Sequence, residues 1–183
     1  MSGLRLLACA PTPAMREARF GGDEDIDEGG RRAALALPAF ARRELWVCSP
    51  SRAACETAQA LGHTALREAA LRDPDMGRWA GMSLDEVAAA DPQGLHRWLT
   101  DPGAAPHGGE SLTQVRARTG QWLDAMARQR VVAVAHPVVV RAALAHALQL
   151  SEPGVWALEV APLSLTRLVH RAGRWHLHLP AAQ

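Results

Sequence analysis

The sequence predicts an α/β fold: a three-layer sandwich in which a mainly parallel central sheet is flanked by helices, with a hairpin near the C-terminus. Three observations support this. Short apolar, strand-like runs alternate along the chain with segments of helical periodicity. The runs 4–9 and 131–134 are almost continuously apolar, which is typical of strands buried on both faces of a parallel sheet. Near the C-terminus, two alternating segments, 163–171 and 174–179, flank Ala172-Gly173 and predict a hairpin.

The first half of the chain follows this pattern element by element. After strand 4–9 we expect a loop and then a helix over about 28–36. A short buried strand at 45–49 precedes a helix over 51–61, with Ser49 or Ser51 available to cap it and Pro50 near its first turn. An extended segment is expected over 64–71. Residues 73–106, rich in Gly, Pro and Asp, are expected to form loop and short helix, the usual wall or lid of a site.

The clearest helix signal begins at Ser111. Ser111 and Gln114 form a capping box ahead of apolar residues at helical spacing. Strand 131–134 then leads to His136, and Pro137 stands where a helix through Leu148 would begin. No internal repeat or long linker interrupts this order, so we expect a single domain over residues 1–183.

The composition narrows the class of partner. The chain has 183 residues, 48% of them hydrophobic, enough for one well-buried core. All basic residues are arginine, which suggests the codon bias of a GC-rich bacterial genome. The net charge is +1 and the acidic stretch 23–28 lies beside basic residues, so neither nucleic acid nor a membrane surface is an expected partner. A small diffusible ligand fits better.

Targeting signals and cysteine spacing bear on the location of the protein and on its metal or disulfide content. We find no apolar run long enough to span a membrane and no secretion-signal pattern, so a cytoplasmic location is expected. The cysteines, Cys9, Cys48 and Cys55, lack metal-ligand spacing. Free thiols are therefore expected, with no metal site and no cofactor.

Candidate site residues gather where strands end. In parallel sheets, ligands bind beyond the carboxyl ends of the strands, and both Cys9 and His136 follow predicted strands. His136 also precedes a helix N-terminus, whose free N–H groups suit an anion. The loop after Cys9 adds Arg16 and Arg19. The pattern predicts an anion site at this edge of the sheet.

Five stretches stand in a characteristic order along the chain: 19–30 (RFGGDEDIDEGG), 48–58 (CSPSRAACETA), 71–83 (LRDPDMGRWAGMS), 107–111 (HGGES) and 131–144 (VVAVAHPVVVRAAL). In this order and spacing they resemble the histidine phosphatase superfamily, the phosphoglycerate-mutase-like proteins. The resemblance runs over nearly the whole chain and implies that fold.

The resemblance also implies a chemistry. In the family, a histidine after the first strand attacks phosphorus, an acidic residue protonates the leaving oxygen, and a second histidine with two arginines holds the phosphoryl oxygens. By this resemblance His136 matches the second histidine, and Asp73 stands where the family carries its acid.

The sequence departs from the family where the chemistry would occur. Ala8-Cys9 occupies the place of the Arg-His pair that carries the attacking histidine. Ala53 stands where the second motif would place an arginine, and Arg52 comes one residue early, about 100° away on a helix. Losing one charge-stabilising donor typically costs about 10² to 10³ in turnover. We therefore expect weak or no classical phosphatase activity, which leaves open whether the chain is an enzyme.

Three functions follow from these residues. The first is a phosphomonoester hydrolase of small metabolites with a degenerate pocket. The second is a catalytically inactive relative, a pseudoenzyme, that binds an anionic metabolite or a partner protein. The third is an enzyme that uses Cys9 and His136, with Asp73 as acid or base. The expected ligand is a small anionic metabolite such as a phosphate ester. The candidate catalytic residues are Cys9, Asp73 and His136, and the candidate anion-binding residues are Arg16, Arg19, Arg52 and His136.

Plainer roles stand beside these. Cys9 at a strand end is commonly a small buried hydrophobe. Asp73 in "RDPD" also suits an ordinary turn. Arg141 is expected to be structural and Glu110 to support the start of the helix that follows it. The tryptophans are expected to pack the core and the pocket wall.

Overall fold

A six-stranded sheet, with strand order β3-β2-β4-β1-β5-β6, forms the centre of the protein. The computed structural model describes residues 3–38, 40, 44–151 and 153–179. β1 to β4 run parallel to one another, while β5 pairs antiparallel with β1 and with β6. This confirms the mainly parallel sheet and the terminal hairpin. The strands are β1 (Gly3–Ala8), β2 (Leu45–Cys48), β3 (Leu66–Arg67), β4 (Arg130–Ala135), β5 (Leu165–Arg171) and β6 (Arg174–His178).

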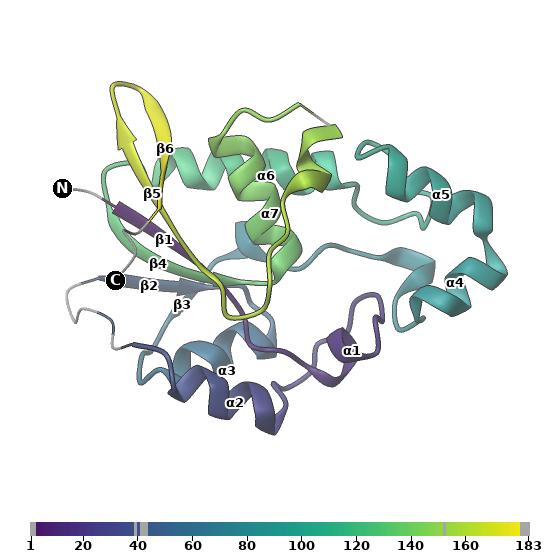
Figure 1. Ribbon diagram of the computed structural model, residues 1–183, viewed down its shortest axis with the longest axis horizontal. Helices are drawn as coiled ribbons and strands as arrows, with labels where there is room; N and C mark the ends of the chain where they lie inside the picture. The colour runs from purple at the N-terminus through teal and green to yellow at the C-terminus, as the bar shows by residue number, and fades with distance from the viewer. Residues whose placement is uncertain (1–2, 39, 41–43, 152, 180–183) are drawn as a thin grey trace.

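Helices cover both faces of the sheet (Figure 1). α2 (Glu28–Leu35) and α3 (Arg52–Ala60) lie on one face, and α6 (Leu112–Ala125) and α7 (Pro137–Ala147) lie on the other. β1 contributes side chains to the cores on both faces of the sheet. Leu4 and Leu6 belong to the core under α6 and α7, and Leu7 belongs to the core on the α3 side. The predicted three-layer sandwich is confirmed, and the largely apolar run of β1, interrupted at Arg5, reflects its burial on both faces.

Short elements extend beyond the carboxyl ends of the parallel strands. They are α1 (Pro13–Arg16), the 3-10 turns η1 (Ala69–Leu71), η2 (Gly77–Trp79) and η3 (Pro153–Ala157), α4 (Leu84–Ala90) and α5 (Pro92–Thr100). α4 and α5 project to one side of the sandwich (Figure 1), and we call residues 76–100 the cap. The cap has its own small core, formed by Met76, Trp79, Val87 and Leu95.

Most predicted helix signals are confirmed, and two local details differ. The Ser111–Gln114 capping box forms at the start of α6, and Pro137 occupies the first turn of α7. In the segment 64–71, only Leu66–Arg67 is strand. The Glu68 side chain accepts a hydrogen bond from the Ala70 N–H at 3.0 Å, which turns the chain into η1 instead. The loop after β1 contains the one-turn helix α1, capped by the side chain of Thr12.

Candidate functional site

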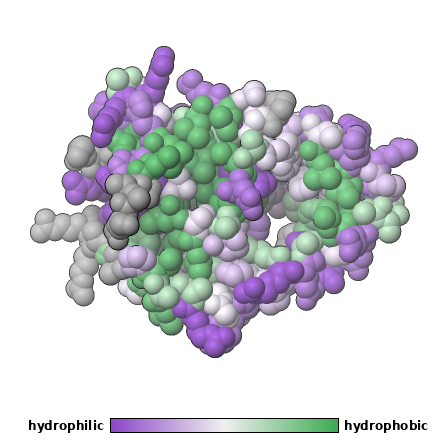
Figure 2. Space-filling view, in the orientation of Figure 1, coloured by the Kyte–Doolittle hydropathy of each residue, from purple (hydrophilic) through white to green (hydrophobic). Residues whose placement is uncertain are grey.

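A pocket of about 520 Å³ opens between the carboxyl ends of the sheet and the cap. Its walls come from the loop after β1, from α3, from the start of α6 and α7, from η3 and from the cap. Figure 2 shows the surface hollowed between the body of the molecule and the part that carries α4 and α5, with hydrophobic side chains gathered beside the hollow. The size is that of a small-molecule site.

His136 lies at the base of this pocket, where β4 ends and α7 begins. Its Nδ1 accepts a hydrogen bond from the Val138 N–H at 3.3 Å, so the neutral ring carries its proton on Nε2. Burial lowers the pKa of His136; the nearby Asp73 carboxylate opposes this shift and Arg141 adds to it. The structure thus presents a neutral imidazole that can donate one hydrogen bond.

Asp73 lines the same pocket, in the loop after η1. The Ser49 hydroxyl donates a hydrogen bond to its Oδ1 at 3.1 Å, and Ser49 is itself fully buried after β2. Burial raises the pKa of Asp73, against the opposing effects of the His136 ring and the Ser49 hydrogen bond. Sequence reasoning considered Ser49 only as a helix cap; in the structure it orients the pocket carboxyl.

Cys9 lies behind the pocket wall. Its side chain belongs to the core cluster on the α3 face, with 1% of the residue exposed, and it is not among the residues that line the cavity. Its backbone N–H donates to the Ala135 carbonyl at 2.8 Å. Burial raises the pKa of the thiol far above its ordinary value, and the Asp73 carboxylate adds to the shift. The structure brings His136 and Asp73 together in the cavity but leaves Cys9 outside it.

The predicted anion-binding arginines do not converge. Arg16 is paired with Asp27, and neither Arg16 nor Arg52 lines the cavity. The guanidinium of Arg52 binds Asp25 at 2.6 Å, because its position at the start of α3 directs it away from the pocket. Arg19 does line the cavity, but its guanidinium is held by carboxylates of two acidic residues, Glu17 at 2.7 Å and Glu86 at 3.1 Å.

Two residues expected to be structural belong to the pocket lining. Arg141, one turn into α7, donates from Nε to the Leu158 carbonyl at 2.8 Å, and its guanidinium lies 5.6 Å from the centre of the Trp156 ring. Glu110 also lines the cavity, and its carboxylate accepts hydrogen bonds from Nε and Nη2 of Arg118 at 2.7 and 2.8 Å. The helix predicted after His136 could have indicated this, because Arg141 follows Val138, another lining residue, by three positions and shares its face of α7.

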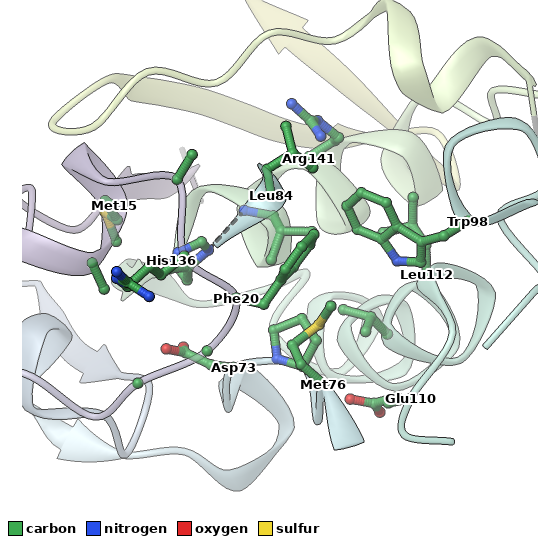
Figure 3. A pocket seen from close by; sticks show the side chains of 18 of the residues that line it. Met15, Phe20, Asp73, Met76, Leu84, Trp98, Glu110, Leu112, His136 and Arg141 are labelled. Atoms are coloured by element: carbon green, nitrogen blue, oxygen red, sulfur yellow. Dashed lines mark hydrogen bonds between the residues drawn. The ribbon is translucent and has the colours of Figure 1, made fainter. Parts of the chain in front are cut away.

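At the two positions where the resemblance expects arginine, this chain has the small, uncharged side chain of alanine. Ala53 on α3 lines the cavity, and Ala8 at the end of β1 is fully buried. The remaining wall is largely apolar (Figure 3) and includes Phe20, Trp98 and Trp156, as expected for the tryptophans.

Comparisons with known proteins agree with this architecture. A family model described as the histidine phosphatase superfamily (branch 1) matches residues 10–183. A phosphoserine phosphatase 1 from Hydrogenobacter thermophilus is 32% identical over 132 residues, which are 66% of this chain and 63% of that protein. A glucosyl-3-phosphoglycerate phosphatase from Mycolicibacterium vanbaalenii is 35% identical over 146 residues, 70% of this chain and 65% of that protein. The matched part thus spans less than two thirds of each relative.

Solved structures match over nearly the full chain. A mycobacterial glucosyl-3-phosphoglycerate phosphatase in complex with VO3 superposes with a TM-score of 0.83 and 28% identity, covering 98% of both chains. A Bacillus stearothermophilus protein, YhfR, has a TM-score of 0.86 at 24% identity, covering 97% of this chain and 95% of that chain. At this low identity the match supports the fold alone. These neighbours define the class as α/β proteins of the phosphoglycerate-mutase-like phosphatase fold. The chain belongs to the histidine phosphatase superfamily.

Two features are absent from the residues that the structure describes. No helix among them is long and apolar enough to cross a membrane. Within the same residues, no group of three or more His, Cys, Asp or Glu side chains is arranged to hold a metal ion.

Proposed function

We propose that this protein binds a small anionic metabolite in the pocket and does not hydrolyse phosphate esters by its family's phosphohistidine mechanism. The observation that carries the proposal is Cys9, which stands where the resemblance expects the attacking histidine. The residue is 1% exposed, lies outside the cavity, and has a thiol pKa raised by burial. A buried, protonated thiol is a poor nucleophile.

The charges around the pocket support the same proposal. Ala8 and Ala53 stand at positions where the resemblance expects arginine, and neither can stabilise a phosphoryl group. The nearest alternative on α3, Arg52, is engaged with Asp25. Since a missing donor typically costs about 10² to 10³ in turnover, two such losses together with the missing nucleophile argue against the ordinary chemistry.

Cysteine-based catalysis by Cys9 and His136 has less support. A reactive thiolate is usually stabilised by a neighbouring positive charge, such as an imidazolium. Here burial raises the pKa of Cys9 and lowers that of His136, so both groups favour their neutral forms near pH 7. The site therefore provides neither the thiolate that would attack nor the imidazolium that would stabilise it.

An anionic ligand is supported by the solved relatives, which include glucosyl-3-phosphoglycerate phosphatases in complex with VO3 and with inorganic phosphate. In this chain, His136 can donate a hydrogen bond into the pocket, and Arg141 lies in its wall. Binding without turnover is what these two groups support in the absence of a nucleophile.

Hydrolysis of p-nitrophenyl phosphate between pH 4 and 8 tests the proposal. We expect no turnover above the buffer rate from this protein or from Cys9→Ala. The triple variant Ala8→Arg/Cys9→His/Ala53→Arg is expected to gain activity, which His136→Ala should then remove. Turnover by the unmodified protein at a rate within tenfold of the triple variant would contradict the proposal. Loss of that turnover in Cys9→Ala would assign it to the thiol.

A further inference from the structure

We propose that the pocket takes an amphipathic monocarboxylic acid with a flat apolar body. Its carboxylate pairs with Arg141, and its body packs against the aromatic wall formed by Phe20, Trp98 and Trp156. The inference rests on the proposed function, because it names the class of ligand that the same pocket binds without turnover.

The aromatic wall is assembled from three separate segments. Phe20, from the loop after α1, meets Trp98 of α5 edge-on with ring centres 5.3 Å apart. Trp98 in turn meets Trp156 of η3 at 5.7 Å. Met76 and Leu112 extend the apolar lining at the side of the rings (Figure 3). Aromatic rings that support one another in this way offer rigid apolar surface to a flat ligand.

Most charged groups in the wall already have partners. The guanidinium of Arg19 is bound by Glu17 and Glu86. The carboxylate of Glu110 is bound by Arg118 on two sides at 2.7 and 2.8 Å. These groups are compensated within the protein and have little charge left to offer a ligand.

Arg141 differs from these groups. Its Nε donates to the Leu158 carbonyl at 2.8 Å, and among the described residues no carboxylate forms an ion pair with the guanidinium. Glu159 acts on it only through longer-range electrostatics. Trp156 lies beside the guanidinium, 5.6 Å from its central carbon. The two terminal nitrogens form the planar fork that binds a carboxylate through parallel hydrogen bonds.

The charged residues of the pocket favour a ligand with a single negative charge over a ligand with two. Arg141 lies on one side of the pocket, whereas Asp73 and Glu110 lie on the other (Figure 3). An anionic group beside Arg141 meets a guanidinium that no described carboxylate pairs with, whereas one near Asp73 and Glu110 finds no such unpaired positive charge. A single guanidinium balances the charge of a carboxylate and leaves half the charge of a phosphate dianion uncompensated.

Three probes that share one ring system test the inference: 2-naphthoate, 2-naphthalenemethanol and 2-naphthyl phosphate. Binding is measured by titration calorimetry at pH 7.5. We expect 2-naphthoate to bind at least about tenfold tighter than the alcohol, a difference of about 1.4 kcal/mol, and tighter than the phosphate. Arg141→Gln should remove the advantage of the carboxylate while leaving the affinity of the alcohol unchanged, which also verifies that the pocket is intact.

Further variants separate the contribution of the carboxylate to binding from that of the apolar body. Arg97→Gln, at an exposed position on α5, should change none of the affinities. Trp98→Ala should weaken all three probes. The inference is overturned if Arg141→Gln keeps the preference for the carboxylate, if the alcohol or the phosphate binds as tightly, or if none of the probes binds. Release of inorganic phosphate from 2-naphthyl phosphate would instead contradict the proposed function, whatever the order of affinities.

Discussion

Asp73 and His136 are the titratable pair at the base of the pocket, and their surroundings favour the neutral form of each. Burial raises the pKa of the carboxyl and lowers that of the imidazole. Each group also favours the charged form of the other, but this attraction is smaller than the effect of burial. Removing the carboxyl charge should therefore register as a change in stability that depends on pH.

Asp73→Asn is expected to stabilise the protein at neutral pH by about 1 kcal/mol, because it removes a buried charge whose desolvation the Ser49 hydrogen bond and the His136 ring offset only in part. Because folding raises the pKa of Asp73, the folded state holds its proton to higher pH than the unfolded state, and stability falls as pH rises from about 4. The advantage of the variant should thus be greatest at pH 7 to 8 and shrink towards pH 4.

Thermal unfolding across this pH range checks the prediction, with Asp85→Asn at an exposed position on α4 as the control. The asparagine keeps an oxygen that can accept the Ser49 hydrogen bond, so the comparison isolates the charge. A variant less stable than the parent at pH 7, or a difference that does not vary with pH, would refute it.

Cys9 is expected to resist alkylation in the folded protein. Its side chain is almost completely buried and its thiol pKa is raised, so iodoacetamide at pH 8 should modify it about a hundredfold more slowly than in the unfolded chain. Cys55 is partly exposed and should react first. Peptide mapping by mass spectrometry after timed labelling measures both rates. Equal rates at the two cysteines would mean that the Cys9 thiol reaches solvent.

At the scale of elements, the close packing of α6 on α7 holds one side of the sandwich together. Gly120 of α6 faces His146 of α7, and a Cβ added at Gly120 would lie 2.3 Å from the ring Nδ1. The ring is held by a hydrogen bond between its Nε2 and the Asp124 carboxylate at 2.9 Å. The indole N–H of Trp175 on β6 donates to the same carboxylate at 2.8 Å. A helix pair and the terminal hairpin thus meet at one carboxylate.

Gly120→Ala is expected to lower the free energy of unfolding by about 1–3 kcal/mol, the usual cost of overpacking, despite the higher helix propensity of alanine. In a His146→Ala background the same change should cost much less or even stabilise, because the clash is gone. Urea unfolding of the four proteins in this double-mutant cycle measures the coupling. Purely additive effects would show that the ring moves aside freely.

At the scale of the whole molecule, the cap is joined to the loop after β1 through aromatic contacts. Trp79 is 1% exposed and lies 5.4 Å from Phe20 and 6.2 Å from Trp98, measured between ring centres. His107, just before α6, packs against it at 5.2 Å. The position of the pocket wall therefore depends on a residue that does not itself line the pocket.

Trp79→Ala is expected to cost about 3–5 kcal/mol of unfolding free energy, the range for a large buried aromatic residue. Trp175→Ala, at a partly exposed position on the hairpin, should cost less and serves as the control. Guanidinium denaturation followed by circular dichroism gives both values. A loss for Trp79→Ala no larger than the control would mean that the cap contributes little to the cooperative fold.

The order of strands and helices could be predicted from the sequence because it depends on local patterns. The apolar run of β1, the Ser111–Gln114 box and Pro137 at the start of α7 each act within a few residues. The turn at η1 was missed because it depends on one hydrogen bond from the Ala70 N–H to the Glu68 side chain, which the apolar pattern does not reveal.

Periodicity in the sequence was enough to predict the layered α/β architecture and the place of His136 at a strand end. The order of the motifs was enough to predict the family, and through that resemblance the role of Asp73. Which charged side chains face the cavity became clear from the folded structure alone. Arg16 and Arg52 find acidic partners elsewhere, Cys9 turns into the core, and Arg141 faces the pocket. The reason is physical: spacing along the chain positions a backbone, but the direction and pairing of a side chain depend on neighbours distant in sequence.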